Sequence, residues 1–337
     1  MMKHMTMLVA PASQMMRAFI RFATLTLLTV GSLSATASSQ AQTRGSVQII
    51  NLMPSFWKFW ANAKDMSAPQ QLERWQSLYI RPNETVFHDL ILPCVRHLGP
   101  TALEEEYFPA LPGYVGGMRM LESSLPQTIA HTRVKFQKSF PDMAWHGNIY
   151  LMASAGCFNG RSQKIDGQES LLLGLDDIVG LHETDLPPLL EHELFHRYHH
   201  AFFAYEPDHN EQMWVRLWAE GMATYVSQNL SPSASYMDTM WMTDKKIADL
   251  DAGASTLAAS FLRSFDSTNQ TDADHYFLQD VSSDPRIPGH TGYYLGMRVA
   301  KLLNRHYSLA TMAHWSRFEA EAHIREALQQ IAAERPR

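Results

Sequence analysis

The stretch EHELFH, residues 191–196, is the most informative part of this sequence for fold and function. It lies in an apolar segment that predicts one helix, capped by Thr184 or Asp185. His192 and His196 are four residues apart, so their imidazoles project from the same face of that helix. The pair is therefore a candidate for two nitrogen ligands of one cation, at the roughly 2.0–2.1 Å that zinc prefers.

Glu193 follows the first of these histidines, one step round the helix. Its carboxylate cannot easily bind the same cation, but it can reach a water molecule that the cation holds. Because a divalent cation makes such a water acidic, a nearby carboxylate can take its proton as it attacks a carbonyl. H-E-x-x-H on a helix is a signature of this chemistry, so Glu193 is the predicted general base.

A catalytic zinc site needs a third protein ligand and one open position. Asp208 and His209 lie in a polar connector, and either is possible. Glu220 is favoured, because it is a lone carboxylate in the otherwise apolar helix LWAEGMATY, residues 217–225, and burial without a partner or a cation would be costly. Its neighbour Gly221 is small enough to let this helix approach another backbone closely.

The rest of the chain predicts helices and a small sheet. Two strand-like runs precede the metal helix, at 148–153 and 170–175, and a turn is predicted at 156–161. Helical patterns lie at 46–63, 70–78, 84–92 and 126–140, and then at 211–229, 238–250, 254–265, 292–306 and 320–333. The expected fold class is α+β, mainly helical, with a small β-sheet before the metal-binding helix.

The first 41 residues are predicted to be a signal peptide. Basic residues precede an apolar stretch at 22–33, and small residues follow at 34–42, which is the pattern of a cleaved secretory leader. The apolar stretch, about 12 residues, is too short for a membrane span of roughly 20. We therefore expect a secreted or periplasmic protein with no stable membrane span in its mature chain. A helical N-terminal lobe at 42–144 and a catalytic region at 145–337 are predicted to follow.

The composition of the chain limits the kinds of partner that it can bind. The chain has 337 residues, 45% of them hydrophobic, and a formal net charge of −6. It contains no basic run and no basic–aromatic stripe, which argues against a nucleic-acid partner. Its two cysteines, Cys94 and Cys157, could form one disulfide in an oxidising compartment or remain separate thiols, because sequence does not give their distance in space.

The sequence also resembles a known family. Glu220, in an Ala-Glu-Gly frame after the HExxH motif, resembles the third ligand of a gluzincin. The chain is similar to the bacterial predicted zinc-dependent protease domains related to gliding-motility lipoproteins, over about residues 145–305, and both LLLGLD at 171–176 and GHTGYYLG at 289–296 fit that type. It differs in having no cysteine for a lipid anchor, and in Thr224, where thermolysin-like gluzincins carry an acid.

The resemblance implies a zincin-like catalytic domain that binds Zn²⁺ through the two histidines and Glu220 and hydrolyses a peptide or protein substrate. It implies that the strand at 148–153 lies beside the cleft, where substrate backbone can pair with it. It also implies that Tyr293 or Tyr294 faces the metal and stabilises the oxyanion.

Other polar residues have less specific interpretations. His199, His200 and His209 are predicted to be solvated or to lie beside the ligands, because polar side chains are mostly exposed. Asp176 and Asp177 could hold an imidazole N–H in place or could serve as turn or capping residues.

Three alternatives to a zinc peptidase remain open. The first is an exported binding or scaffold protein with a structural metal site, although such a site would have no need of Glu193. The second is a metallohydrolase that acts on a non-peptide amide or a lactone, and no residue of the sequence discriminates against it. The third is a chance motif in a metal-free helical protein.

Overall fold

The structure, a computed structural model, describes residues 47–88, 91–92, 94, 99–144, 147–181, 185–205, 211–278 and 290–334. The predicted signal peptide, together with Asp208 and His209, lies outside these residues. Residues 44–337 belong to one compact unit. Within the described residues, no helix is both long enough and apolar enough to cross a membrane.

A four-stranded mixed sheet has the order β1-β2-β4-β3. Its strands are β1 (Gln48–Asn51), β2 (Asn148–Met152), β3 (Gly160–Ile165) and β4 (Gln168–Gly174). β1 and β4 both run parallel to β2, whereas β3 pairs antiparallel with β4. The β3–β4 hairpin turns at Asp166-Gly167, where both residues have positive φ (49° and 75°), as two-residue hairpin turns with an Asp-Gly sequence require.

The sequence predicted β2 and β4 and missed the other two strands. Almost all residues of β2 and β4 are buried. Strands buried on both faces have continuous apolar sequences, so these two strands can be predicted from sequence. β3, GRSQKI, is mostly half-buried and polar, so it carries no apolar pattern, and its first two residues lie in the segment that the sequence predicts as a turn. β1 was included in a helical opening at 46–63, but the helix begins only at Met53.

The position of β2 corrects a further expectation. β2 is hydrogen-bonded on both sides, to β1 and to β4. An interior strand has no free backbone groups to offer a substrate, so the expected pairing of substrate with residues 148–153 is wrong. β3 is the strand at the edge of the sheet on the side of the helix that carries the HExxH motif.

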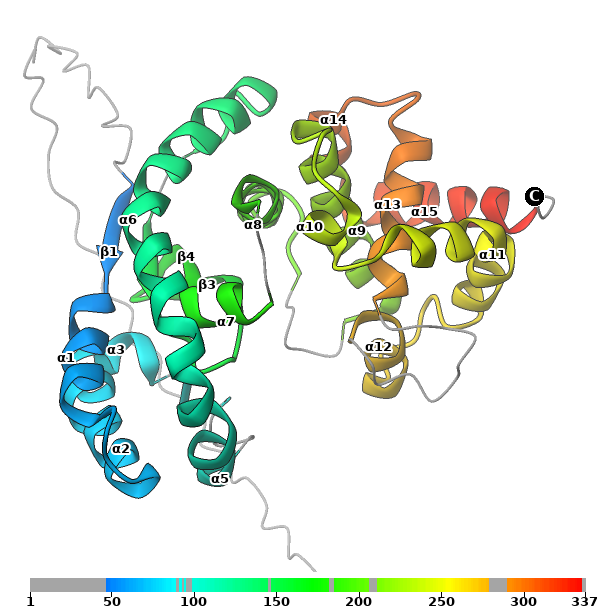
Figure 1. Cartoon of the computed structure of the whole chain (residues 1–337). Helices are drawn as coiled ribbons and strands as arrows, with labels where there is room; N and C mark the ends of the chain where they lie inside the picture. Colours follow the sequence, from blue (N-terminus) through cyan, green and yellow to red (C-terminus); the bar gives the residue numbers. More distant parts are fainter. Residues whose placement is uncertain are drawn as a thin grey trace, which may run out of the picture. The chain divides into compact units, whose positions relative to one another are not determined.

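Helices make up most of the structure (Figure 1), and the predicted α+β, mainly helical fold class is confirmed. The α-helices are α1 (Met53–Ala63), α2 (Ala68–Trp75), α3 (Glu84–Phe87), α5 (Pro100–Ala102), α6 (Phe108–Ser139), α7 (Leu175–Gly180), α8 (Leu186–His200), α9 (Met213–Leu230), α10 (Tyr236–Met240), α11 (Asp244–Arg263), α12 (Gln270–Phe277), α13 (Thr291–Leu303), α14 (Leu309–Ala313) and α15 (Arg317–Ala332). The π-helical turns η1 (Gln76–Ile80) and η3 (Leu103–Tyr107) and the 3₁₀ turn η2 (Arg81–Asn83) connect some of them.

Two helices are longer than the sequence suggested. The segments predicted at 238–250 and 254–265 are largely one helix, α11, which passes through Gly253. The segment predicted to start at Pro126 is the second half of α6, which is 32 residues long and contains Pro112 and Pro126. Glycine and proline weaken a helix, but packing of the buried face overrides that local cost at Gly253, Pro112 and Pro126.

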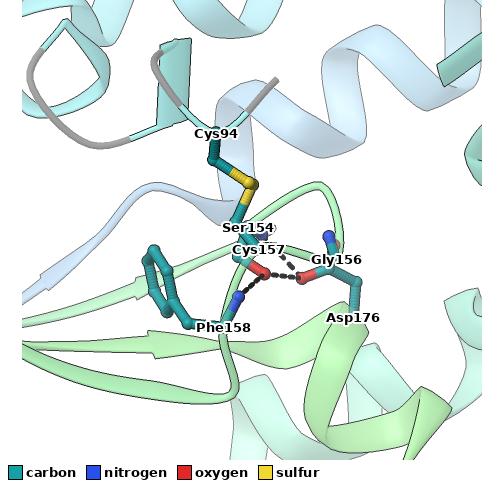
Figure 2. Close-up of a disulfide and its surroundings, with 6 residues drawn as sticks. All are labelled: Cys94, Ser154, Gly156, Cys157, Phe158 and Asp176. Atoms are coloured by element: carbon teal, nitrogen blue, oxygen red, sulfur yellow. Dashed lines mark hydrogen bonds between the residues drawn. A yellow bond between two sulfur atoms is a disulfide. The ribbon is translucent and has the colours of Figure 1, made fainter. Parts of the chain in front are cut away.

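A disulfide joins Cys94 to Cys157, with Cα atoms 6.2 Å apart, which resolves the open question about the two thiols. Figure 2 shows that Cys157 lies in the loop between β2 and β3, beside Asp176. The buried Asp176 carboxylate accepts hydrogen bonds from the backbone N–H groups of Ser154 (2.6 Å) and Gly156 (3.2 Å). Asp176 therefore holds this loop in place. Of the two roles predicted for it, it has that of a turn residue and does not hold an imidazole N–H.

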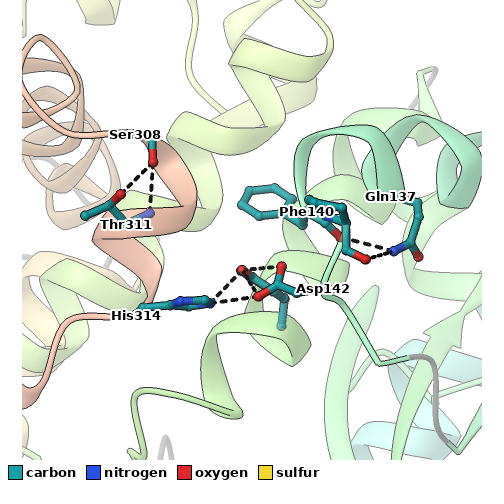
Figure 3. Close-up of polar contacts among 8 residues, drawn as sticks. Gln137, Phe140, Asp142, Ser308, Thr311 and His314 are labelled. Carbon is teal, nitrogen blue, oxygen red and sulfur yellow. Dashed lines mark hydrogen bonds and ion pairs between the residues drawn. The ribbon is translucent and has the colours of Figure 1, made fainter.

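The C-terminal end of α8 is anchored to two other elements. Tyr198 donates a hydrogen bond of 3.0 Å to Asp142, just after α6. His314, at the end of α14, lies 3.1 Å from the same carboxylate (Figure 3). These contacts hold α8 in position independently of the residues at its centre.

Candidate metal centre

Three donor atoms converge between α8 and α9. The carboxylate of Glu220 lies 3.3 Å from Nε2 of His192 and 3.2 Å from Nε2 of His196, and the two Nε2 atoms are 2.9 Å apart. Tetrahedral ligands about 2.0–2.1 Å from a zinc ion lie about 3.3 Å from one another, so the observed spacing is close to what one ion needs. His192, His196 and Glu220 thus form a group that could hold a metal ion.

A close helix crossing places Glu220 at this point. A Cβ on Gly221 would lie 2.2 Å from the backbone of Gly296 in α13. Only two glycines let α9 and α13 approach so closely. The sequence predicted a close approach at Gly221 but did not identify α13 as the partner.

The charges of the three side chains are coupled. Burial by itself would raise the pKa of the Glu220 carboxyl, but the adjacent imidazoles hold that pKa well below its usual range. Burial lowers the pKa of His196, yet the nearby Glu220 carboxylate outweighs it and raises that pKa overall. Glu220 is therefore ionised under all ordinary conditions, as a metal-binding carboxylate has to be.

Tyr205 orients one of the imidazoles. Its hydroxyl lies 2.9 Å from Nδ1 of His196, which leaves Nε2 of His196 facing Glu220. Metal-binding histidines commonly have such a partner on the second ring nitrogen. No sequence pattern predicts the role of Tyr205, because its contact with His196 depends on how the chain turns after α8.

Glu193 is buried, with 7% of its surface exposed, and lines the same groove as the three converging side chains. Burial raises the pKa of its carboxyl, and the neighbouring His196 and His192 only partly offset this. A Cβ on Gly160, in β3, would lie 2.7 Å from Cγ of Glu193. The edge strand therefore packs directly against the predicted base, through a residue that has no side chain.

The structure distinguishes between the two candidate tyrosines, Tyr293 and Tyr294. The ring of Tyr293 lies nearly parallel to that of His192, with centroids 6.3 Å apart, and its hydroxyl is within hydrogen-bonding reach of Glu220. Tyr294 points elsewhere and donates a hydrogen bond of 2.7 Å to Asp251 in α11. Tyr293 is thus at the site, and the expectation that Tyr294 might face it is corrected, because successive residues of α13 point about 100° apart.

The other histidines of α8 have distinct environments. His199 is fully buried and stacks on the rings of Phe195 and Phe203, so the expectation that it is solvated or beside the ligands does not match its position in the aromatic core. His200 lines the groove and contacts the carbonyl of Tyr205 at 3.0 Å.

The site opens into a groove of about 510 Å³. Helices α8, α9 and α13 supply one wall, together with Trp241, and residues 159–164, largely β3, supply the other. Trp241 has a left-handed backbone conformation (φ 57°) and packs edge-on against Tyr293, with centroids 5.9 Å apart.

Comparison with protein-family models, with curated proteins and with solved structures finds no match to this chain. The resemblance to gluzincins therefore remains a prediction.

Proposed function

We propose that this protein is an exported zinc-dependent hydrolase of peptide or related amide bonds. The observation that carries the proposal is the convergence of two imidazole nitrogens and one carboxylate oxygen at 2.9–3.3 Å from one another, with a buried carboxylate beside them in an open groove. Two nitrogen donors and one oxygen donor, with one side left open, are the ligand set of a catalytic zinc rather than a structural one.

Each side chain has a role in this proposal. When bound, zinc would act as a Lewis acid and make water a nucleophile near neutral pH. Glu193 accepts the proton of the attacking water and returns it to the leaving amine, a task for which a raised carboxyl pKa is suited. Burial, together with the carboxylates of Glu220 and Glu193, raises the pKa of Tyr293, so its hydroxyl keeps its proton and can donate a hydrogen bond to the oxyanion.

Export is supported by two independent features. The first 41 residues have the pattern of a secretory leader. The Cys94–Cys157 disulfide is of a kind that persists in oxidising compartments and is rare in the cytosol.

Three variants test the proposal. Elemental analysis of the purified protein should find one zinc per chain, and Glu220→Gln should lose it. Glu193→Gln should keep the zinc and lose hydrolysis of a peptide library by on the order of 100-fold or more. Glu73→Gln, an exposed glutamate of α2, is the matched control and should change neither.

The same experiment separates the alternatives. Bound zinc with no cleavage of any peptide, amide or lactone would favour a binding protein with a structural metal. Cleavage of non-peptide amides or lactones alone would favour a metallohydrolase that does not act on peptides. Absence of zinc from the wild-type protein would favour a chance HExxH motif in a metal-free helical protein.

A further inference from the structure

Trp241 is an aromatic residue of the groove to which the proposed chemistry gives no role. Apart from Trp241, Tyr205 and Tyr293, the described residues that line the groove are a glycine and residues with polar or charged side chains. Tyr205 is buried, whereas Trp241 and Tyr293 are half-buried and keep part of their surface exposed. Among the described lining residues, an apolar group that entered the groove would therefore find apolar surface mainly at these two rings.

The backbone conformation of Trp241 is unusual for a tryptophan. Trp241 is the C-cap of α10, with left-handed dihedral angles (φ 57°, ψ 35°), and its N–H donates a hydrogen bond of 3.1 Å to the carbonyl of Met237. Many helices end in this conformation, but glycine usually takes the position, because a side chain makes it costly. The helix end does not explain a tryptophan here, and a costly conformation beside a candidate site points to a role for its side chain.

The indole ring is held in place by three other rings. It packs edge-on against Tyr293, His192 and His290, with centroids 5.9 Å, 6.3 Å and 5.6 Å apart. Such edge-to-face contacts are favourable for aromatic pairs, and a ring that is already fixed loses little freedom when a ligand packs on it. Trp241 and Tyr293, whose planes are 87° apart, thus form an aromatic corner beside His192.

We propose that this aromatic corner binds a large apolar side chain of the substrate, next to the bond that is cut. The inference rests on the proposed function and adds a substrate class to it: peptides with a residue such as phenylalanine or leucine flanking the scissile bond. His192, a proposed zinc ligand, contacts both rings of the corner. A side chain packed there would therefore belong to a residue close to the metal centre.

Peptide binding to the zinc-loaded Glu193→Gln protein, measured by calorimetry, tests this inference without requiring turnover. The probes are two hexapeptides of glycine and serine, blocked at both ends, that differ in one central residue, phenylalanine or alanine. The phenylalanine peptide should bind on the order of 10-fold more tightly, as expected when most of a phenyl ring leaves water.

Substitutions of Trp241, made in the Glu193→Gln protein, then assign the preference to this residue. Trp241→Gly removes the ring and suits the left-handed conformation, so the end of α10 should still form while the preference for phenylalanine is lost. Trp241→Phe should retain part of the preference, and it keeps the test valid if the glycine variant does not fold. Trp60→Phe, at a half-buried tryptophan of α1 outside the groove, is the matched control and should keep the full preference.

Two results would overturn the inference: equal affinity for the two peptides, or a full preference that survives in Trp241→Gly. Neither result affects the proposed function, which is tested separately by zinc content and by cleavage in the wild-type protein. Conversely, a wild-type protein that binds zinc and cuts nothing would refute the proposed hydrolysis, and the difference in affinity between the two peptides could still be measured.

Discussion

The two walls of the groove are built in different ways. The helical wall holds the three converging side chains on α8 and α9, and α9 packs closely against α13 at Gly221 and Gly296. The strand wall is an edge strand, β3, bonded only to β4 and preceded by a loop that the Cys94–Cys157 disulfide restrains. In the proposed enzyme, the helical wall would fix the metal geometry, whereas the strand wall would position the base and the substrate.

Gly221→Ala should have the largest effect, because it breaks the helical wall. The new Cβ would lie 2.2 Å from the backbone of Gly296, so α9 and α13 must separate. We expect a loss of about 3 kcal/mol in the free energy of unfolding, together with weaker zinc binding because Glu220 moves with α9. Denaturant unfolding and zinc titration measure both.

Gly253→Ala is the control for this change. Gly253 lies in α11 with open space at its Cβ position, so alanine should stabilise the protein by roughly 0.5–1 kcal/mol. Equal effects of the two substitutions would mean that the close packing of α9 against α13 does not limit residue size at Gly221.

His199→Phe should remove a pH dependence from the helical wall. Burial, with His196, His200 and His314 nearby, lowers the pKa of His199 to about 3, whereas an unfolded histidine titrates near 6.5. The unfolded state therefore binds the extra proton first, and stability present above about pH 6.5 falls progressively down to about pH 3. The wild-type protein should lose about 2 kcal/mol between pH 7.5 and pH 5 from this residue alone.

Denaturant unfolding of metal-free protein at the two pH values provides the measurement. Other titrating groups contribute equally to both proteins, so the difference between wild type and His199→Phe isolates this residue. The same pH dependence in both would show that His199 is not neutral in the folded state.

Tyr205→Phe should weaken metal binding with little change in stability. The substitution removes the 2.9 Å contact to Nδ1 of His196, which frees the ring to rotate. Losing such a partner typically costs about 10-fold in zinc affinity, measured by competition with a chromogenic chelator. Tyr307→Phe, a tyrosine of the chain outside the groove, should leave the affinity unchanged.

Gly160→Ala should have the smallest effect and act through the strand wall alone. Its Cβ would press on the side chain of Glu193 at 2.7 Å, and a flexible side chain can shift at small cost. Hydrolysis should fall roughly 5-fold, as expected when a reacting group is displaced by less than 1 Å, with zinc affinity unchanged. If zinc affinity fell as well, the two walls would not act independently. Gly116→Ala, at an open position of α6, is the control.

The sequence predicted best those features that depend on the chemistry of a side chain and on its spacing along one helix or strand. Two histidines four apart on a helix share a face whatever surrounds them, and a lone carboxylate among apolar residues needs a partner in any fold. Those rules predicted His192, His196, Glu193 and Glu220 as one group, and the structure brings their side chains together. The buried strands β2 and β4 were predicted for the same reason, since an apolar run is a local property.

Other features depended on contacts between distant segments. β3 has a polar sequence and is a strand only because β4 pairs with it. Which of Tyr293 and Tyr294 faces the groove was decided by the crossing of α13 over α9, and the contact of Tyr205 with His196 by the turn of the chain after α8. The sequence by itself determined the donor atoms and the helix face that carries them. The tertiary structure decided the edge strand and the tyrosine, because these arise from the relative placement of segments that no local pattern encodes.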